Sequence, residues 1–113
     1  MTNLEADTRY LYYCGSDLGW SSTYWFRTPP KAQDQWSPRL AIYGDLGNEN
    51  AQSLPRLQEE TQRDMYDAIL HVGDFAYDMN TQNAEVGDEF MRQIEAIAAY
   101  LPYMVVPGNH EVA

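Results

Sequence analysis

Three short segments of the sequence each place a polar residue that can bind a metal ion directly after a glycine. They are Gly44-Asp45-Leu46-Gly47, Gly73-Asp74-Phe75-Ala76-Tyr77 and Gly108-Asn109-His110-Glu111. A glycine lets the chain turn sharply and leaves space for a metal ion or a substrate beside the backbone. Carboxylate, phenol, amide and imidazole groups could together bind metal ions and act on an anionic substrate. The residue types therefore indicate metal-assisted chemistry, provided that the three segments meet.

Each segment alone is a weak indication of a site, because a Gly-Asp pair after a strand is usually only a turn. Asp17-Leu18-Gly19 repeats part of the first segment inside a hairpin loop, and we interpret it as a turn. Tyr77 alone would be a packing aromatic residue, and His110 alone would be an ordinary turn histidine. Only the occurrence of all three segments, in order and each after a predicted strand, favours a shared metal site.

The residues between the three segments alternate between strand and helix patterns. Apolar strands are predicted at residues 39–45, 68–74 and 103–110, and amphipathic helices at 49–67 and 83–100. The short connections imply parallel strands joined by right-handed crossovers, which is an α/β fold with a βαβαβ unit. The carboxyl ends of parallel strands open on one edge of the sheet, where ligands bind. We therefore expect Asp45, Asp74 and Asn109 to converge at that edge.

Residues 1–30 differ in character from the rest of the chain. Two stretches rich in aromatic and β-forming residues flank Gly19, which predicts a β-hairpin. An isolated hairpin is only marginally stable in water, so we interpret it as the last two strands of a β-sandwich. Residues 31–38 show neither helical nor strand periodicity and are predicted to be a linker, and residues 39–113 hold the α/β unit.

The composition disfavours several classes of function. The formal net charge is −10 and Lys31 is the only lysine, so the surface would repel nucleic acids and anionic membranes. No apolar stretch approaches the ~20 residues of a transmembrane helix, and the first residues do not resemble a signal peptide. Cys14 is the only cysteine and cannot form an internal disulfide. An anionic substrate would need local positive charge, which again favours a metal.

The ordered motifs GD-x-G, GD-x-x-Y and GNHE resemble the metallophosphoesterase superfamily and, within it, the purple acid phosphatases. Gly47 and Tyr77 carry the distinction, since most other metallophosphoesterases have Asp-x-His in the first motif and lack the tyrosine. Residues 12–28 are similar to the end of the fibronectin-like domain that precedes the catalytic domain in long purple acid phosphatases. The resemblance covers nearly the whole chain and is nearest to the animal iron/zinc proteins. It implies a partial metallophosphoesterase βαβαβ unit after the last hairpin of a fibronectin-like β-sandwich.

The resemblance also implies a metal-binding role for four residues. Asp74 would bridge two metal ions, Asp45 and Tyr77 would bind the first ion, and Asn109 would bind the second. The cofactors implied are Fe(III) and a divalent ion, which could be zinc, iron or manganese. The pKa of a phenol is about 10, so Tyr77 would ionise near neutral pH only beside a strongly polarising cation such as Fe(III).

The activity implied is an acid phosphatase that hydrolyses phosphate monoesters, with a metal-bound hydroxide as the nucleophile. His110 would contact the substrate and could donate a proton to the leaving alcohol, and Glu111 would support His110. The family is secreted, so an extracellular location is expected although the chain shows no signal peptide. The physiological substrate and the oligomeric state are left open.

The family pattern includes two further motifs, Val-x-x-His and Gly-His-x-His, which supply three metal-binding histidines. The 113 residues contain only His71 and His110, and His71 lies in a predicted buried strand where we expect a structural role. Asp74 and Asn109 alone would be a poor site for a divalent ion that favours imidazole. A second possibility therefore stays open, namely a truncated, catalytically inactive isoform or fragment of the same family. The first two motifs disfavour a nuclease or a protein phosphatase of the wider superfamily.

Overall fold

The computed structural model describes residues 1–32 and 35–112. The chain divides into two compact units, Met1–Ser37 and Pro38–Ala113. The first unit contains β-strands and the second is an α/β unit. Among the described residues, no helix has the length and apolar character needed to cross a membrane.

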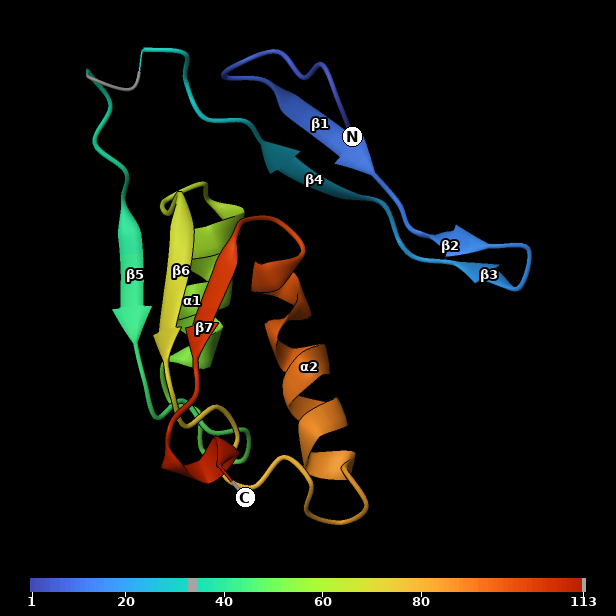
Figure 1. Cartoon of the computed structure of the whole chain (residues 1–113), viewed down its shortest axis with the longest axis vertical. Coiled ribbons are helices and arrows are strands. Elements are labelled where there is room, and N and C mark those ends of the chain that lie inside the picture. The colour runs from blue at the N-terminus through green and yellow to red at the C-terminus, as the bar shows by residue number, and fades with distance from the viewer. Residues whose placement is uncertain (33–34, 113) are drawn as a thin grey trace. The chain divides into compact units, whose positions relative to one another are not determined.

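The first unit is a long antiparallel hairpin, as its aromatic stretches predict. Its strands are β1 (Arg9–Tyr12), β2 (Gly15–Ser16), β3 (Gly19–Trp20) and β4 (Tyr24–Arg27). β1 pairs with β4, and β2 pairs with β3 closer to the tip (Figure 1). Tyr10 and Phe26 face each other across β1 and β4 with ring centroids 5.7 Å apart. The tip holds Leu18, which is 100% exposed, so the Asp-Leu-Gly repeat is a turn as predicted.

The second unit contains the predicted βαβαβ arrangement. In chain order it consists of β5 (Leu40–Tyr43), α1 (Leu54–Gln62), β6 (Ala68–Val72), α2 (Glu85–Ala98), β7 (Tyr103–Val106) and the 3₁₀ turn η2 (Asn109–Glu111). The sheet order is β5-β6-β7, and both pairings are parallel. The three arrows in Figure 1 therefore point the same way, towards the end where the loops that follow them gather.

The core of this unit lies between the sheet and the two helices. It combines strand residues with apolar residues at helical spacing, namely Ala41, Ile69, Leu54, Leu57, Phe90, Ile94 and Ile97. α1 is shorter than the predicted stretch 49–67, because it begins at Leu54 with Pro55 in its first turn and ends at Gln62. Asp64, with a left-handed φ of +59°, follows the end of the helix. Met65, predicted on the apolar face, consequently lies beyond the helix and is 43% exposed.

The opposite face of the sheet is apolar and exposed within the described part of the chain. Five side chains on this face are 44–61% exposed, namely Leu40, Ile42, Val72, Met104 and Val106. On the helix-covered face of β6, Ile69 and His71 are fully buried, as expected for His71. The expectation that the strand at 68–74 is buried on both faces is therefore wrong, because the described residues of the second unit pack against one face of its sheet and Val72 on the other face is 52% exposed.

Candidate metal centre

The three motif segments lie where the strands end, at the carboxyl edge of the sheet. Asp45 and Asp74 each come two residues after a strand, and Asn109 comes three residues after β7. Asp45 and Asp74 both adopt left-handed backbone conformations, with φ of +53° and +52°. Such conformations are costly for a residue with a side chain and concentrate at functional sites. The same sharp turn is thus built twice, once after each of two neighbouring strands.

Backbone contacts hold the three loops together. The N–H of Asp45 donates to the carbonyl of Gly73 at 3.1 Å, and the N–H of Gly47 donates to the carbonyl of Phe75 at 2.9 Å. A Cβ at Gly73 would lie 2.7 Å from the Cα of Gly108. A Cβ at Gly108 would in turn overlap the carboxylate of Asp74. The glycines of the second and third motifs are therefore required for the close approach of their two loops.

Tyr77 brings side chains from the three motifs into contact. Its hydroxyl donates a hydrogen bond to Oδ1 of Asp45 at 3.0 Å, and its ring packs edge-on against His110 with centroids 4.8 Å apart. Gly47 lies beneath the ring, since a Cβ there would be 3.7 Å from it. Desolvation, followed by the hydrogen bond to Asp45 and nearby carboxylate charges, raises the pKa of the Tyr77 phenol. The phenol therefore keeps its proton unless a cation offsets these charges.

His110 lies between two aspartates. Its backbone N–H donates to Oδ1 of Asp74 at 3.1 Å, and its Nδ1 lies 3.1 Å from Oδ1 of Asp78. The hydrogen bond to Asp78 is the main reason that the pKa of His110 is raised, although desolvation opposes it. The sequence reasoning did not assign a role to Asp78. Its position directly after Tyr77, as an acidic residue next to the second motif, is the signal that could have identified it.

Glu111 connects the second and third loops through backbone groups. Its carboxylate accepts hydrogen bonds from the N–H of Asp74 at 2.8 Å, of Phe75 at 2.9 Å and of Gly108 at 2.8 Å. Desolvation would raise the pKa of Glu111, but these three N–H groups outweigh it and the pKa is lowered. The carboxylate is therefore held in its charged form between the two loops.

The donor groups at this edge fit a hard cation better than a borderline one. Asp45 and Tyr77 already place a carboxylate and a phenol oxygen 3.0 Å apart, and oxygen donors suit hard cations. Asn109 begins η2 and is exposed. In residues 1–32 and 35–112, no cluster of three or more His, Cys, Asp and Glu side chains could hold a metal ion. A metal centre built from these described residues would need the phenol or the amide as well as the carboxylates.

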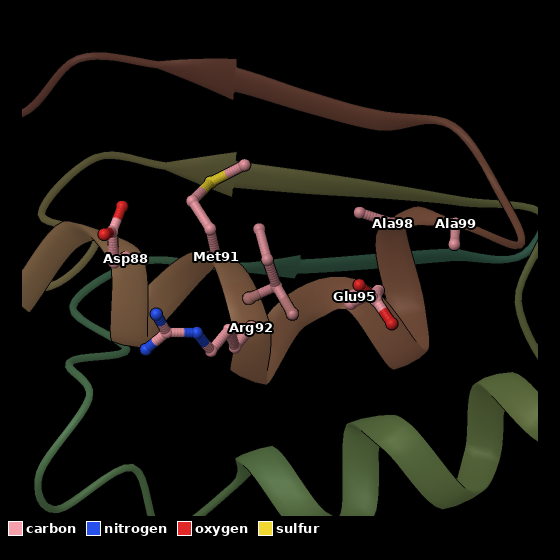
Figure 2. Close-up of a pocket in the computed structure, with 7 residues that line it drawn as sticks. Asp88, Met91, Arg92, Glu95, Ala98 and Ala99 are labelled. Carbon is pink, nitrogen blue, oxygen red and sulfur yellow. The ribbon is translucent and has the colours of Figure 1, made fainter. Parts of the chain in front are cut away.

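Two hollows are formed by described residues of the second unit, and the smaller of these two adjoins the motif residues. A cavity of about 400 Å³ is lined by Asp45, Gly47 and Tyr77, together with polar residues such as Asn48 and Thr81. The other hollow, of about 510 Å³, lies along α2 and is shown in Figure 2. None of the predicted site residues lines this larger hollow, so its size does not make it the candidate site.

The chain matches a known family model over most of its length. Residues 38–112 match the model described as "Calcineurin-like phosphoesterase". The chain is 56% identical over 113 residues to "Acid phosphatase type 7" of Danio rerio, covering 100% of this chain and 25% of that protein. It is 58% identical over 111 residues to the Homo sapiens protein of the same name, covering 98% of this chain and 25% of that protein.

Plant proteins show a more distant similarity. The chain is 33% identical over 112 residues to "Fe(3+)-Zn(2+) purple acid phosphatase 12" of Arabidopsis thaliana, covering 97% of this chain and 24% of that protein. The solved structure of a purple acid phosphatase from yellow lupin (Lupinus luteus) seeds superimposes with a TM-score of 0.75 and 31% identity, covering 98% of this chain and 22% of that one. The chain thus spans about a quarter of the length of the curated relatives that it matches.

Proposed function

This chain belongs to the calcineurin-like phosphoesterase family, and from that premise we propose that it supplies part of the dinuclear centre of an acid phosphatase. The predicted resemblance to purple acid phosphatases is confirmed by the similarity to the Arabidopsis thaliana protein and to the yellow lupin structure, beside that to acid phosphatase type 7. The observation that carries the proposal is the contact of Tyr77 with both Asp45 and His110, which joins three motifs at one sheet edge. The proposed substrates are phosphate monoesters.

The proposal includes a domain organisation. Residues 1–30 would be the last strands of a fibronectin-like domain, residues 31–38 a linker, and residues 39–113 the first part of the catalytic domain. The antiparallel hairpin and the division of the chain near Ser37 support this reading. The superposition on a purple acid phosphatase over 98% of the chain also supports it.

Asp45, Tyr77 and Asp74 would hold Fe(III), and Asp74 and Asn109 would contribute to a divalent zinc, iron or manganese ion. Such a pair of ions, when bound, would polarise the phosphoryl group and offset the negative charge that develops during its displacement. Tyr77 suits the first ion because its hydroxyl lies against Asp45, where loss of the phenol proton would leave two adjacent anionic oxygens for one cation. The carboxylates that raise the pKa of the phenol would then be neutralised.

His110 would act as the proton donor to the leaving alcohol. Its contact with Asp78 uses Nδ1, so Nε2 is the atom that would carry the proton towards the substrate. The raised pKa of His110 keeps the ring protonated up to a higher pH than for an ordinary histidine. This protonation state suits an enzyme that works at acidic pH.

A chimera tests the proposal. In it, these 113 residues replace the segment that they match in acid phosphatase type 7 of Danio rerio. We expect the chimera to hydrolyse p-nitrophenyl phosphate at acidic pH, and Asp45→Ala to abolish this activity. Asp17→Ala is the matched control, because Asp17 occupies the same Asp-Leu-Gly tripeptide in the hairpin turn. A folded chimera without phosphatase activity, or equal effects of the two substitutions, would contradict the proposal.

A second candidate is a non-enzymatic product of the same family that binds metal weakly. The exposed apolar face of the sheet favours it, because five side chains there are 44–61% exposed. The 113 residues also provide only Asp74 and Asn109 for the second ion. If the chimera is active but the chain expressed alone is inactive, the result would support a non-enzymatic role for the isolated chain.

A further inference from the structure

Glu111 is placed to hold the second motif loop against the third. Its Oε2 accepts hydrogen bonds from the N–H groups of both Asp74 and Gly108, each at 2.8 Å. Its Oε1 accepts from the N–H of Phe75 at 2.9 Å. Two consecutive amides of one loop and one amide of the next therefore share a single carboxylate.

These three amides lie in a partly buried place where water is a poor substitute for the carboxylate. The backbones of the two loops are in close contact, since a Cβ at Gly73 would lie 2.7 Å from Gly108. Hydrogen bonds to a charged acceptor are shorter and stronger than neutral ones, and donors left without a partner destabilise a buried loop. The position of the two loops therefore depends on this carboxylate.

The effect of Glu111 extends to the residues that we assign to the metal centre. It holds the backbone of Asp74, whose Oδ1 accepts the N–H of His110 at 3.1 Å. It also holds Phe75, whose carbonyl accepts the N–H of Gly47 at 2.9 Å in the first loop. The carboxylate is thus hydrogen-bonded directly to the backbone of the second and third motif loops, and it is linked to the first loop through Phe75.

We propose that Glu111 is a positioning residue that orients the carboxylate of Asp74 through the backbone amides of the second loop. This inference rests on the proposed function, because Asp74 is there the residue shared by the two metal ions. It differs from a role in supporting His110, since the hydrogen bonds of the Glu111 carboxylate go to Asp74, Phe75 and Gly108. Loss of the carboxylate should therefore weaken metal binding before it changes the chemistry of His110.

The test uses the chimera with Glu111→Gln and, as matched control, Glu95→Gln on the exposed side of α2. Glutamine keeps the shape of the side chain but turns one end into a donor, which would face an amide N–H. We expect Glu111→Gln to weaken metal affinity by about 10–100-fold, the effect typical of residues that support metal ligands. The pH profile of the remaining activity at saturating metal should keep its alkaline limb, the decline in activity that deprotonation of His110 would cause as pH rises. Metal affinity equal to that of Glu95→Gln, or a shifted limb with unchanged affinity, would overturn the inference.

Hydrogen–deuterium exchange separates this inference from the proposed function. In the metal-free chimera, Glu111→Gln should speed exchange in peptides that contain Asp74, Phe75 and Gly108, and Glu95→Gln should not. Glu111→Gln could speed exchange even though the chimera without this substitution fails to bind metal when metal is supplied. That result would leave the positioning role of Glu111 intact and refute the proposed metal centre. Unchanged exchange would refute the positioning role, whatever the metal content. Glu111→Asp, one methylene shorter, should restore part of the protection.

Discussion

Tyr77 is the side chain on which the distinction from other metallophosphoesterases depends. Its hydroxyl contacts Asp45 while its ring packs on His110, so the oxygen and the ring have separable roles. Tyr77→Phe keeps the ring and removes the hydroxyl oxygen, which is the atom of this side chain that could bind a metal. We expect the metal-loaded chimera to show a broad visible absorption band that is absent in Tyr77→Phe and retained in Tyr13→Phe on the hairpin. A colourless but active and metal-replete chimera would refute the tyrosinate assignment.

Asp78 sets the pH range over which His110 can donate a proton. The raised pKa of His110 arises mainly from Asp78, so activity that needs the protonated ring should decline only as pH rises through this raised value. In Asp78→Asn the pKa of His110 should fall, and the alkaline limb of kcat/KM should move to lower pH. His110→Ala should lower kcat by roughly 10²–10⁴-fold and remove that limb. An unshifted limb in Asp78→Asn would show that another group titrates there.

Among the secondary-structure elements, α2 fixes the first motif loop as well as the core. Gln93 donates hydrogen bonds from its amide to the carbonyl of Asn48 at 3.0 Å and to Glu89 at 2.9 Å. Its amide oxygen is buried without a hydrogen-bond partner, and this cost partly offsets the benefit. We expect Gln93→Leu to destabilise the chimera by about 1 kcal/mol, the net value of one such hydrogen bond.

Urea unfolding measures this effect, with Glu95→Leu on the same helix as the control for a polar-to-apolar change. Gln93→Leu should lower the midpoint without changing the slope, because the fold and its buried surface stay the same. A midpoint equal to that of the control would show that the bond to Asn48 contributes nothing to stability.

The elements that position the site could be predicted because their signals are local. Leu54, Leu57 and Thr61 recur at helical spacing in the sequence, and all three are buried on α1. The strand patterns correctly placed β5, β6 and β7. Parallel pairing then requires the strand ends to meet at one edge. The convergence of the motif loops therefore followed from the order of the elements, without any knowledge of individual contacts.

The contacts that sequence reasoning did not find all depend on tertiary position. Gln93 and its acceptor Asn48 are 45 residues apart, and nothing local in the helix pattern marks this glutamine. The three amides bound by Glu111 also become neighbours only when two loops pack together. The end of α1 was missed for a local reason, since its helix-forming residues continue past Gln62 although the chain turns near Asp64.

For the whole molecule, the uncovered face of the sheet limits what the 113 residues can do by themselves. Net stability is about 5–15 kcal/mol even for complete domains, and burial contributes roughly 25 cal/mol per Å². An apolar face left in water forgoes much of that contribution and promotes association. We expect the chain expressed alone to aggregate or remain partly unfolded, and to hydrolyse no p-nitrophenyl phosphate above background.

Size-exclusion chromatography, thermal unfolding and metal analysis of the isolated chain check this expectation. The apolar face is testable directly, because replacing Ile42 and Met104 with threonine and glutamine should improve solubility without restoring activity. A soluble chain that unfolds cooperatively, retains two metal ions and hydrolyses the substrate would contradict the expectation.

The metal content of the Asp74→Ala chimera tests the central claim most directly. The claim is that the three motif loops form one centre in which Asp74 is shared by two ions, so removing this carboxylate should remove both. Elemental analysis should find two metal ions per chimera, about none in Asp74→Ala, and two in the Asp17→Ala control. Loss of only one ion, or of neither, would show that Asp74 does not bridge a dinuclear centre and would contradict the account.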